Sequence, residues 1–258
     1  MPKNLNYDFD VNYIMSKPQM ILHKGFIPEY HKGMTSMRQM FNNCHELTSL
    51  DVSSNFDTSK VKDMNGMFLW CDNLTELDLS SFYTPNVEDM GEMFANCDKL
   101  TTLNIPASFI TSNVTNMRLM FCNCSYITTI DLSNFDTSKV EDMSSMFYDC
   151  DSLTTLDLSN LDTSKVKDMK SMFYGCSKLT ALDLSSFDTS NVEDMCAMFI
   201  NCSNLTTIKG VIDMKSCKYF YEDMFHNCPK LKDVKIKNPP SGFEVLSGLS
   251  KSQYTVVS

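Results

Sequence analysis

Residues 140–164 read VEDMSSMFYDCDSLTTLDLSNLDTS, and the first half of this stretch has the apolar spacing of a short helix. Its apolar residues are separated by three, three, one, three and three positions, and they are Val140, Met143, Met146, Phe147, Cys150 and Leu153. Ser138, followed three residues later by Glu141, forms a capping-box pattern at the start of this segment. The first half of the stretch therefore predicts a short helix.

The second half of the same stretch is typical of a strand. Leu156 and Leu158 alternate with polar residues, which is the period of a strand with one buried face. Asp-Thr-Ser at residues 162–164 then indicates a turn into the next helix. One unit is thus predicted to contain a strand, a turn and a short helix.

This unit occurs eight times in tandem. The dipeptide Met-Phe returns every 26 or 27 residues, and a cysteine follows each phenylalanine by three positions. The eight dipeptides begin at Met40, Met67, Met93, Met120, Met146, Met172, Met198 and Met224. Self-similarity at a fixed period is the signature of a repeat architecture, so the chain is predicted to form a single solenoid domain of about eight repeats.

The repeat also explains an unusual composition. The chain has 20 Met, 17 Phe and 11 Cys, and the repeat positions hold 15 of the methionines and eight of the cysteines. Because these eight cysteines share one position on the apolar face, they predict a ladder of buried free thiols. Disulfides between successive coils are the alternative, and they would require Cα separations within ~7 Å.

Two patterns in the unit resemble known repeats. The segment Leu-x-x-Leu-x-Leu, seen at Leu179, Leu182 and Leu184, resembles the strand signature of leucine-rich repeats. The string Asp-Met-x-x-Met-Phe-x-x-Cys-x-x-Leu-Thr-x-Leu-Asp-Leu-Ser-x-Phe-Asp-Thr-Ser-x-Val closely resembles the 26-residue bacterial surface-protein repeat. That repeat belongs with the BspA-like leucine-rich repeats and occurs in mycoplasma-type surface lipoproteins. The resemblance extends from about Met34 to Ile236, which is roughly four-fifths of the chain.

This resemblance implies an α/β solenoid. The expected fold is a right-handed leucine-rich-repeat superhelix with a parallel β-sheet on its concave side and short helices on its convex side. Residues 34–237 would form the solenoid. Residues 1–33 and 238–258 would form N-terminal and C-terminal caps, because the terminal coils would otherwise expose core.

The resemblance also implies a location at a cell surface or on a virus or phage particle. The N-terminus, MPKNLNYDFDVNYIMSK, lacks the basic start and apolar core of a signal peptide. A cytoplasmic location is therefore the alternative, and the many thiols without a disulfide framework favour it slightly.

The candidate binding surface is a polar stripe along the predicted sheet. Alternate strand positions face outward, and one outward row gives the predicted partner-binding residues Asp51, Asp78, Asn104, Asp131, Asp157 and Asp183. The row two residues upstream begins with Ser49 and Glu76 and adds the predicted binding residues Thr102, Thr129 and Thr155. Because adjacent like charges repel in a sheet, the stripe could serve a cationic or sugar-like partner. Alternatively, its carboxylates bind neighbouring backbone or are simply solvated.

Charge is distributed unevenly along the chain. Residues 1–208 carry 14 basic and 27 acidic side chains, a net of −13, whereas residues 209–258 carry 8 and 5, a net of +3. An acidic body with a basic end could favour head-to-tail self-association or docking on an anionic surface. Alternatively, the last two repeats have diverged as capping units.

Several classes of protein are disfavoured. The net charge of −10 argues against a nucleic-acid partner. No apolar run approaches the ~20 residues needed for direct membrane insertion. The four histidines, His23, His31, His45 and His226, show no metal-ligand spacing. The sequence has neither a nucleophile elbow nor a glycine-rich phosphate loop, so neither a cofactor nor an enzymatic activity is predicted.

The sequence therefore predicts a non-catalytic, adhesin-like surface protein that binds a protein or glycan partner through the concave face of its repeats. The alternative is an intracellular leucine-rich-repeat scaffold or structural protein.

Overall fold

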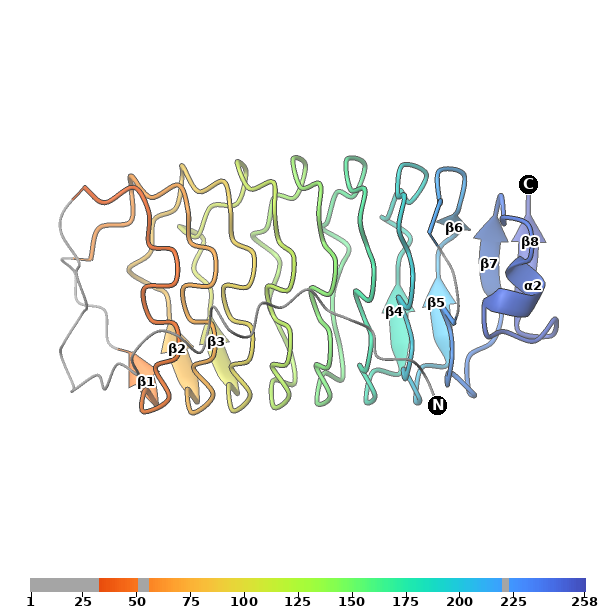
Figure 1. Cartoon of the computed structure of the whole chain (residues 1–258), viewed down its shortest axis with the longest axis horizontal. Helices are drawn as coiled ribbons and strands as arrows, with labels where there is room; N and C mark the ends of the chain where they lie inside the picture. The colour runs from red at the N-terminus through yellow and green to blue at the C-terminus, as the bar shows by residue number, and fades with distance from the viewer. Residues whose placement is uncertain (1–32, 51–55, 220–222) are drawn as a thin grey trace.

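The computed structural model describes residues 33–50, 56–219 and 223–258, and these residues form a stack of coils with little curvature in the view of Figure 1. All strand pairs are parallel. The first sheet contains β1 (Ser49–Leu50), β2 (Glu76–Asp78) and β3 (Thr102–Asn104), and the second contains β4 (Ala181–Asp183) and β5 (Thr207–Lys209). The third contains β6 (Ile212–Asp213), β7 (Val234–Lys237) and β8 (Tyr254–Val257), beside which lies the helix α2 (Phe243–Leu246).

Each coil is also paired with the next at a second position. Single parallel bridges connect, in order, Ser36, Asp63, Asp89, Asn116, Asp142, Asp168, Asp194 and Tyr219. Because successive members are 25 to 27 residues apart in the sequence, one turn of the chain corresponds to one sequence repeat. The predicted parallel solenoid of stacked repeats is confirmed.

The short helices predicted for the Met-Phe segments are wrong. Among the described residues α2 is the only helix, and it lies after the last repeat. The N–H of Phe147 donates to the carbonyl of Met172 in the next coil, at 3.0 Å, whereas a helix would direct it four residues back in its own coil. Within the coil, consecutive tight turns join Met146 to Met143 and Cys150 to Phe147, each with an N–H···O distance of 3.2 Å.

The turns explain why the spacing was misleading. A turn closed between residues i and i+3 returns an apolar side chain to the same side every three positions, as a helix nearly does. These turns contain residues with positive φ, such as Ser145 at 54° and Asp149 at 50°. The position of Asp149 is held in most coils by residues that tolerate this region: Asn43, Asn96, Asn123, Gly175, Asn201 and Asn227.

The predicted capping box is also absent, because its two residues have other partners. The N–H of Ser138 donates to Asp136 Oδ1 at 3.0 Å, which closes a local turn. The carboxylate of Glu141 accepts from Lys167 Nζ of the next coil at 2.7 Å.

The core matches the sequence pattern although the backbone does not. The Met-Phe phenylalanines stack from coil to coil with centroid distances of 5.1 to 5.9 Å, and they are Phe41, Phe68, Phe94, Phe121, Phe147, Phe173, Phe199 and Phe225. All eight are fully buried. Stacked rings of this kind add to the free energy of apolar burial.

The predicted ladder of buried free thiols is confirmed. All 11 cysteines are free, and the eight at the repeat position are buried. From Cys71 to Cys228, each ladder thiol donates to the phenylalanine carbonyl of the preceding coil at 2.9 to 3.2 Å. The ladder therefore also hydrogen-bonds one coil to the next.

The predicted caps remain predictions. Residues 1–32, which make up nearly all of the predicted N-terminal cap, lie outside the described residues. In the predicted C-terminal cap, Phe243 and Leu249 are buried and β8 pairs with β7. The end of the chain thus extends the solenoid by one more strand.

Candidate binding site on the strand face

The structure places the predicted stripe on one outward face of the strands. Five members of the stripe are exposed: Asp78, Asn104, Asp131, Asp157 and Asp183. The apolar residues on either side of Asp131, Asp157 and Asp183 are buried. Asp78 pairs in register with Asn104, and Asp183 pairs with Lys209. We call these five residues together with Lys209 the strand-face row. Asp51 lies outside the described residues.

The upstream row lies beside the strand-face row and is also exposed. It includes the three predicted threonines Thr102, Thr129 and Thr155, together with Glu76. Glu76 pairs in register with Thr102. The two rows therefore form parallel lines of polar side chains along the molecule.

Each aspartate of the strand-face row has a local structural partner. The N–H of the serine two residues further on donates to its Oδ1, at 2.9 Å for Asp78 and Asp131 and at 3.0 Å for Asp157 and Asp183. This contact closes a turn at the end of the strand. The alternative reading, in which the carboxylates bind neighbouring backbone, thus accounts for one oxygen of each.

The same contacts keep the row ionised. The hydroxyl and then the N–H of Ser133 hold the pKa of Asp131 below its ordinary value, and Ser159 does the same for the pKa of Asp157. The pKa of Asp78 is lowered first by the N–H of Ser80. Hydrogen bonds to the charged form of a carboxyl group favour that form, so the row is negatively charged at neutral pH.

Only the ends of the described row have charge or hydrogen-bond partners in the next coil. Asn104 Nδ2 donates to Asp78 Oδ1 at 2.7 Å, and Lys209 Nζ contacts Asp183 Oδ2 at 3.4 Å. Asp131 and Asp157 have no such partner within the part of the chain that the structure describes. The middle of the row therefore presents uncompensated negative charge to solvent.

A hollow of about 400 Å³ lies over the first sheet. It is lined by Ser49, Leu50, Glu76, Leu77, Asp78, Thr102 and Asn104. Three predicted binding residues therefore meet in one depression. Glu76, which is not among the predicted binding residues, adds a second carboxylate to the hollow. It pairs in register with Ser49 and Thr102, and this position in the upstream row could have predicted it as a binding residue.

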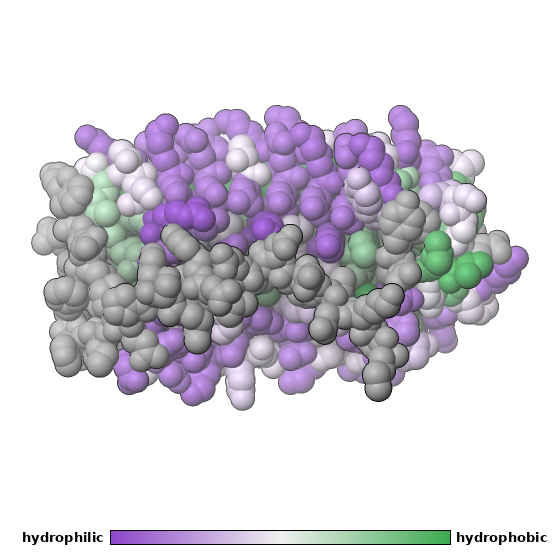
Figure 2. Space-filling view, viewed as in Figure 1, coloured by the Kyte–Doolittle hydropathy of each residue, from purple (hydrophilic) through white to green (hydrophobic). Residues whose placement is uncertain are grey.

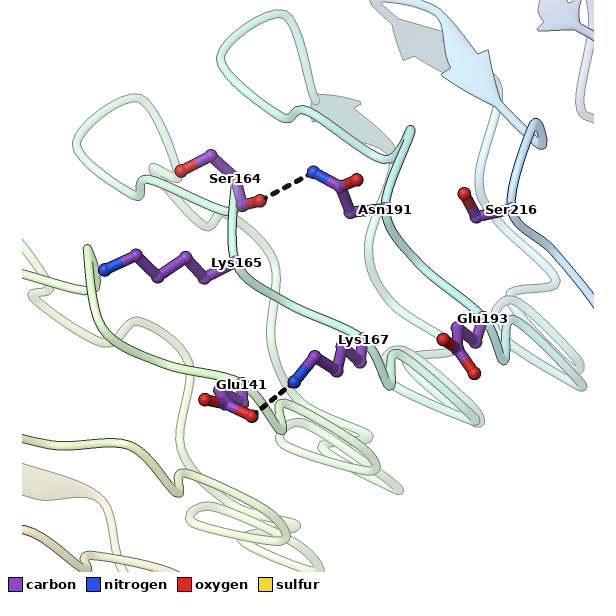
Figure 3. Close-up of a pocket in the computed structure, with 7 residues that line it drawn as sticks. All are labelled: Glu141, Ser164, Lys165, Lys167, Asn191, Glu193 and Ser216. Carbon is purple, nitrogen blue, oxygen red and sulfur yellow. Dashed lines mark hydrogen bonds and ion pairs between the residues drawn. The ribbon is translucent and has the colours of Figure 1, made fainter.

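A second hollow of about 360 Å³ lies elsewhere on the coils and is shown in Figure 3. Its lining residues are Glu141, Ser164, Lys165, Lys167, Asn191, Glu193 and Ser216. Most of its polar groups already bind one another. Glu141 meets Lys167 at 2.7 Å, and Asn191 Nδ2 donates to the Ser164 carbonyl at 2.9 Å (Figure 3). Glu193 pairs with Lys218 at 2.7 Å, so this hollow offers a ligand little unpaired charge.

Within the ladder, Cys97, Cys124 and Cys150 are poor nucleophiles, because burial raises the pKa of each thiol and the thiolate is the reactive form. The described residues contain no group of three or more His, Cys, Asp or Glu side chains placed to hold a metal ion. Among the same residues, no helix is long and apolar enough to span a bilayer.

Parallel coils of 26 or 27 residues with Leu-x-x-Leu-x-Leu strands define a leucine-rich-repeat solenoid. Within this class, residues 31–130 and 117–238 match the family described as Mycoplasma protein of unknown function, DUF285. The chain belongs to this family, which confirms the resemblance to the mycoplasma-type repeat. No curated protein matches the chain.

Three solved structures are similar to the chain at low identity. A leucine-rich repeat protein from Bacteroides ovatus is 16% identical with a TM-score of 0.40, over 86% of this chain and 68% of that one. A leucine rich cell surface protein from Faecalibacterium prausnitzii is 18% identical with a TM-score of 0.27, over 83% and 79%. The TLR13–ssRNA13 complex is 15% identical with a TM-score of 0.27, over 83% and 44%. At these values the likenesses say nothing about a partner or a location.

Proposed function

We propose that the protein is a non-catalytic binding protein whose strand face recognises a basic segment of a partner protein. The observation that carries this proposal is the run of exposed, ionised carboxylates at Asp131 and Asp157, which lack a cation in the neighbouring coils of the described chain. Complementary charge in a partner would remove the repulsion between them. The hollow over β1–β3, with Glu76 and Asp78, would accept a lysine or arginine side chain at one end of this surface.

A protein partner is favoured over a glycan by the composition of the two rows. Neither row contains an aromatic side chain in the described coils. Aromatic faces are the usual apolar platform for ring-shaped ligands, whereas hydroxyls and carboxylates alone favour hydrogen-bonded and ionic contacts. A glycan partner is therefore the second candidate, supported by the row of threonine hydroxyls.

Charge reversal in the middle of the row tests this function. Asp131→Lys with Asp157→Lys should abolish binding of a labelled oligolysine peptide. The melting temperature of this variant should fall no further than that of the matched control, because both variants lose the same kind of serine contact. The matched control is Asp136→Lys with Asp162→Lys. These aspartates are also exposed, accept the same kind of serine N–H at 3.0 and 2.9 Å and lie in the same coils, but off the strand face. Equal loss of binding in both variants would show that only net charge matters and would overturn the proposal.

We propose a cell-surface location, with an intracellular scaffold as the alternative. A surface location is supported by the resemblance of the repeat to the repeats of mycoplasma-type surface lipoproteins, which agrees with the match to a Mycoplasma family. Protease shaving of intact source cells, followed by detection of released peptides, tests it against a lysed-cell control. Peptides that appear only after lysis would assign the protein to the interior.

A further inference from the structure

The two ends of the described solenoid differ in how well their core is covered. At the first coil, Met37 and Phe41 are 1% and 0% exposed. At the last strand, Val256 is 55% exposed although its register partner Ile236 is fully buried. Val245 on α2 is 84% exposed, and the deepest hydrophobic colour of the visible face in Figure 2 lies near this end. The C-terminal end thus presents a core-type position to solvent.

Strand β8 is also the outer edge of its sheet. It pairs with β7 on one side, and within the described residues nothing pairs with the other. An unpaired edge is a template for another strand, and proteins usually guard it with charge or proline. Residues 254–257 read YTVV and contain neither. The edge is therefore open to strand addition.

The surroundings of this edge are basic. Lys235 and Lys237 alternate with the buried residues of β7, so they share the outward side, and Lys235 is exposed. Residues 209–258 carry a net charge of +3. A strand with acidic outward side chains would therefore fit best beside β8.

The chain itself contains a segment of that chemistry. Residues 5–13 read LNYDFDVNY, in which five apolar residues alternate strictly with polar ones. Such alternation is typical of a strand with one buried face. Two of the polar positions are Asp8 and Asp10, which would add negative charge on the side facing away from the core.

We propose that residues 5–13 of one copy add as a strand to β8 of a second copy, so that copies associate head to tail. The distance from the first coil to β8 favours a second copy over the same chain as the source of the added strand. Seven bridged steps separate Ser36 from Tyr219, which at ~4.8 Å each is roughly 34 Å, and β8 lies further on. A flexible linker with the length of residues 14–32 spans only about 25 Å on average. In a head-to-tail pair, the second copy's β8 lies next to the first copy's first coil.

Sedimentation of the full chain over a range of concentrations tests the assembly. We expect the mass to rise with concentration above the 29.4 kDa of one chain, and we expect Val256→Lys to hold it at that value. Val245→Lys is the matched control, because Val245 is more exposed but lies on α2 rather than on the edge strand. A chain that stays at the mass of one copy at every concentration overturns the proposal, as does equal loss of assembly in both variants.

A peptide experiment identifies the occupant even if Val256→Lys does not fold. A labelled peptide of sequence LNYDFDVNY, added to the full wild-type chain, should bind and return the assembly to single chains. A peptide of the same composition in an order without alternation should do neither. If both peptides bind equally, or if neither binds, residues 5–13 do not occupy the edge and the proposal fails.

Discussion

Two rows of charged side chains follow the outside of this solenoid, and they obtain their stability in different ways. The strand-face row is mostly of one sign, and each aspartate is held by the N–H of a serine in its own coil. The second row, which we call the alternating row, pairs opposite charges between coils: Lys62 with Glu88, Glu141 with Lys167, and Glu193 with Lys218. A row satisfied between coils supports their register, whereas a row satisfied within each coil leaves its charge available to a partner.

Both rows depend on the stacked core beneath them, and breaking that core should have the largest effect. Phe147 is fully buried and stacks on Phe121 at 5.8 Å and on Phe173 at 5.7 Å. Phe147→Ala should lower the free energy of unfolding by about 3–5 kcal/mol, because it removes buried area and leaves a cavity. Tyr126→Ala is the control, since Tyr126 is 62% exposed and should change stability by less than about 0.5 kcal/mol. Equal costs in denaturant titrations would mean that the phenylalanine stack is not the core.

A third row, Asp142, Asp168 and Asp194, is of one sign like the strand-face row but is half-buried. We call it the buried row. Burial, followed by the charges of Asp142 and Asp194, raises the pKa of Asp168 from its ordinary 3.8 to about 6. The folded state therefore holds its proton more tightly than the unfolded state. The stability this contributes is complete below about pH 3.8 and is lost as the pH rises through about 6.

Asp168→Asn should therefore be more stable than the wild type above pH 6, and the difference should disappear in acid. The amide oxygen can still accept the N–H of Lys170, which lies 2.8 Å from Asp168 Oδ1. Asp162→Asn is the opposite control. The N–H of Ser164, then its hydroxyl, lowers the pKa of Asp162, so this substitution should destabilise at neutral pH. Melting curves with the same sign for both variants would contradict this account of the buried row.

The sequence predicted which side chains face inward better than it predicted the backbone that places them. Met143, Met146 and Phe147 are buried as the repeat indicates. Their spacing fits both a helical face and a series of turns. The choice depends on hydrogen bonds to the next coil, such as that from the N–H of Phe147 to the carbonyl of Met172, 25 positions away. The local signal that was missed is the recurrence of Asn, Asp or Gly at the position of Asp149, where φ is positive.

The candidate site could be predicted only where single strands define it. Alternation along each strand was enough to place Asp131 and Asp157 on an outward row. The hollow that joins Glu76 to Asp78 and Asn104 depends on the register of three coils, which a single strand does not contain. The pairing of Glu141 with Lys167 likewise becomes visible only when successive repeats are aligned.

The smallest expected effect concerns the alternating row, and it tests whether cross-coil pairing supports the register. Lys62 and Glu88 form an isolated pair at 3.1 Å, since the next member of the row is Thr115. Lys62→Glu should lower the melting temperature slightly at low salt, because it places like charges in adjacent coils, and adding Glu88→Lys should restore it. Both changes should vanish at high salt, since exposed pairs are screened. If the double variant melts as low as the single one, the pairs of the alternating row do not support the register of the coils. The two rows would then differ only in how accessible their charges are to a partner.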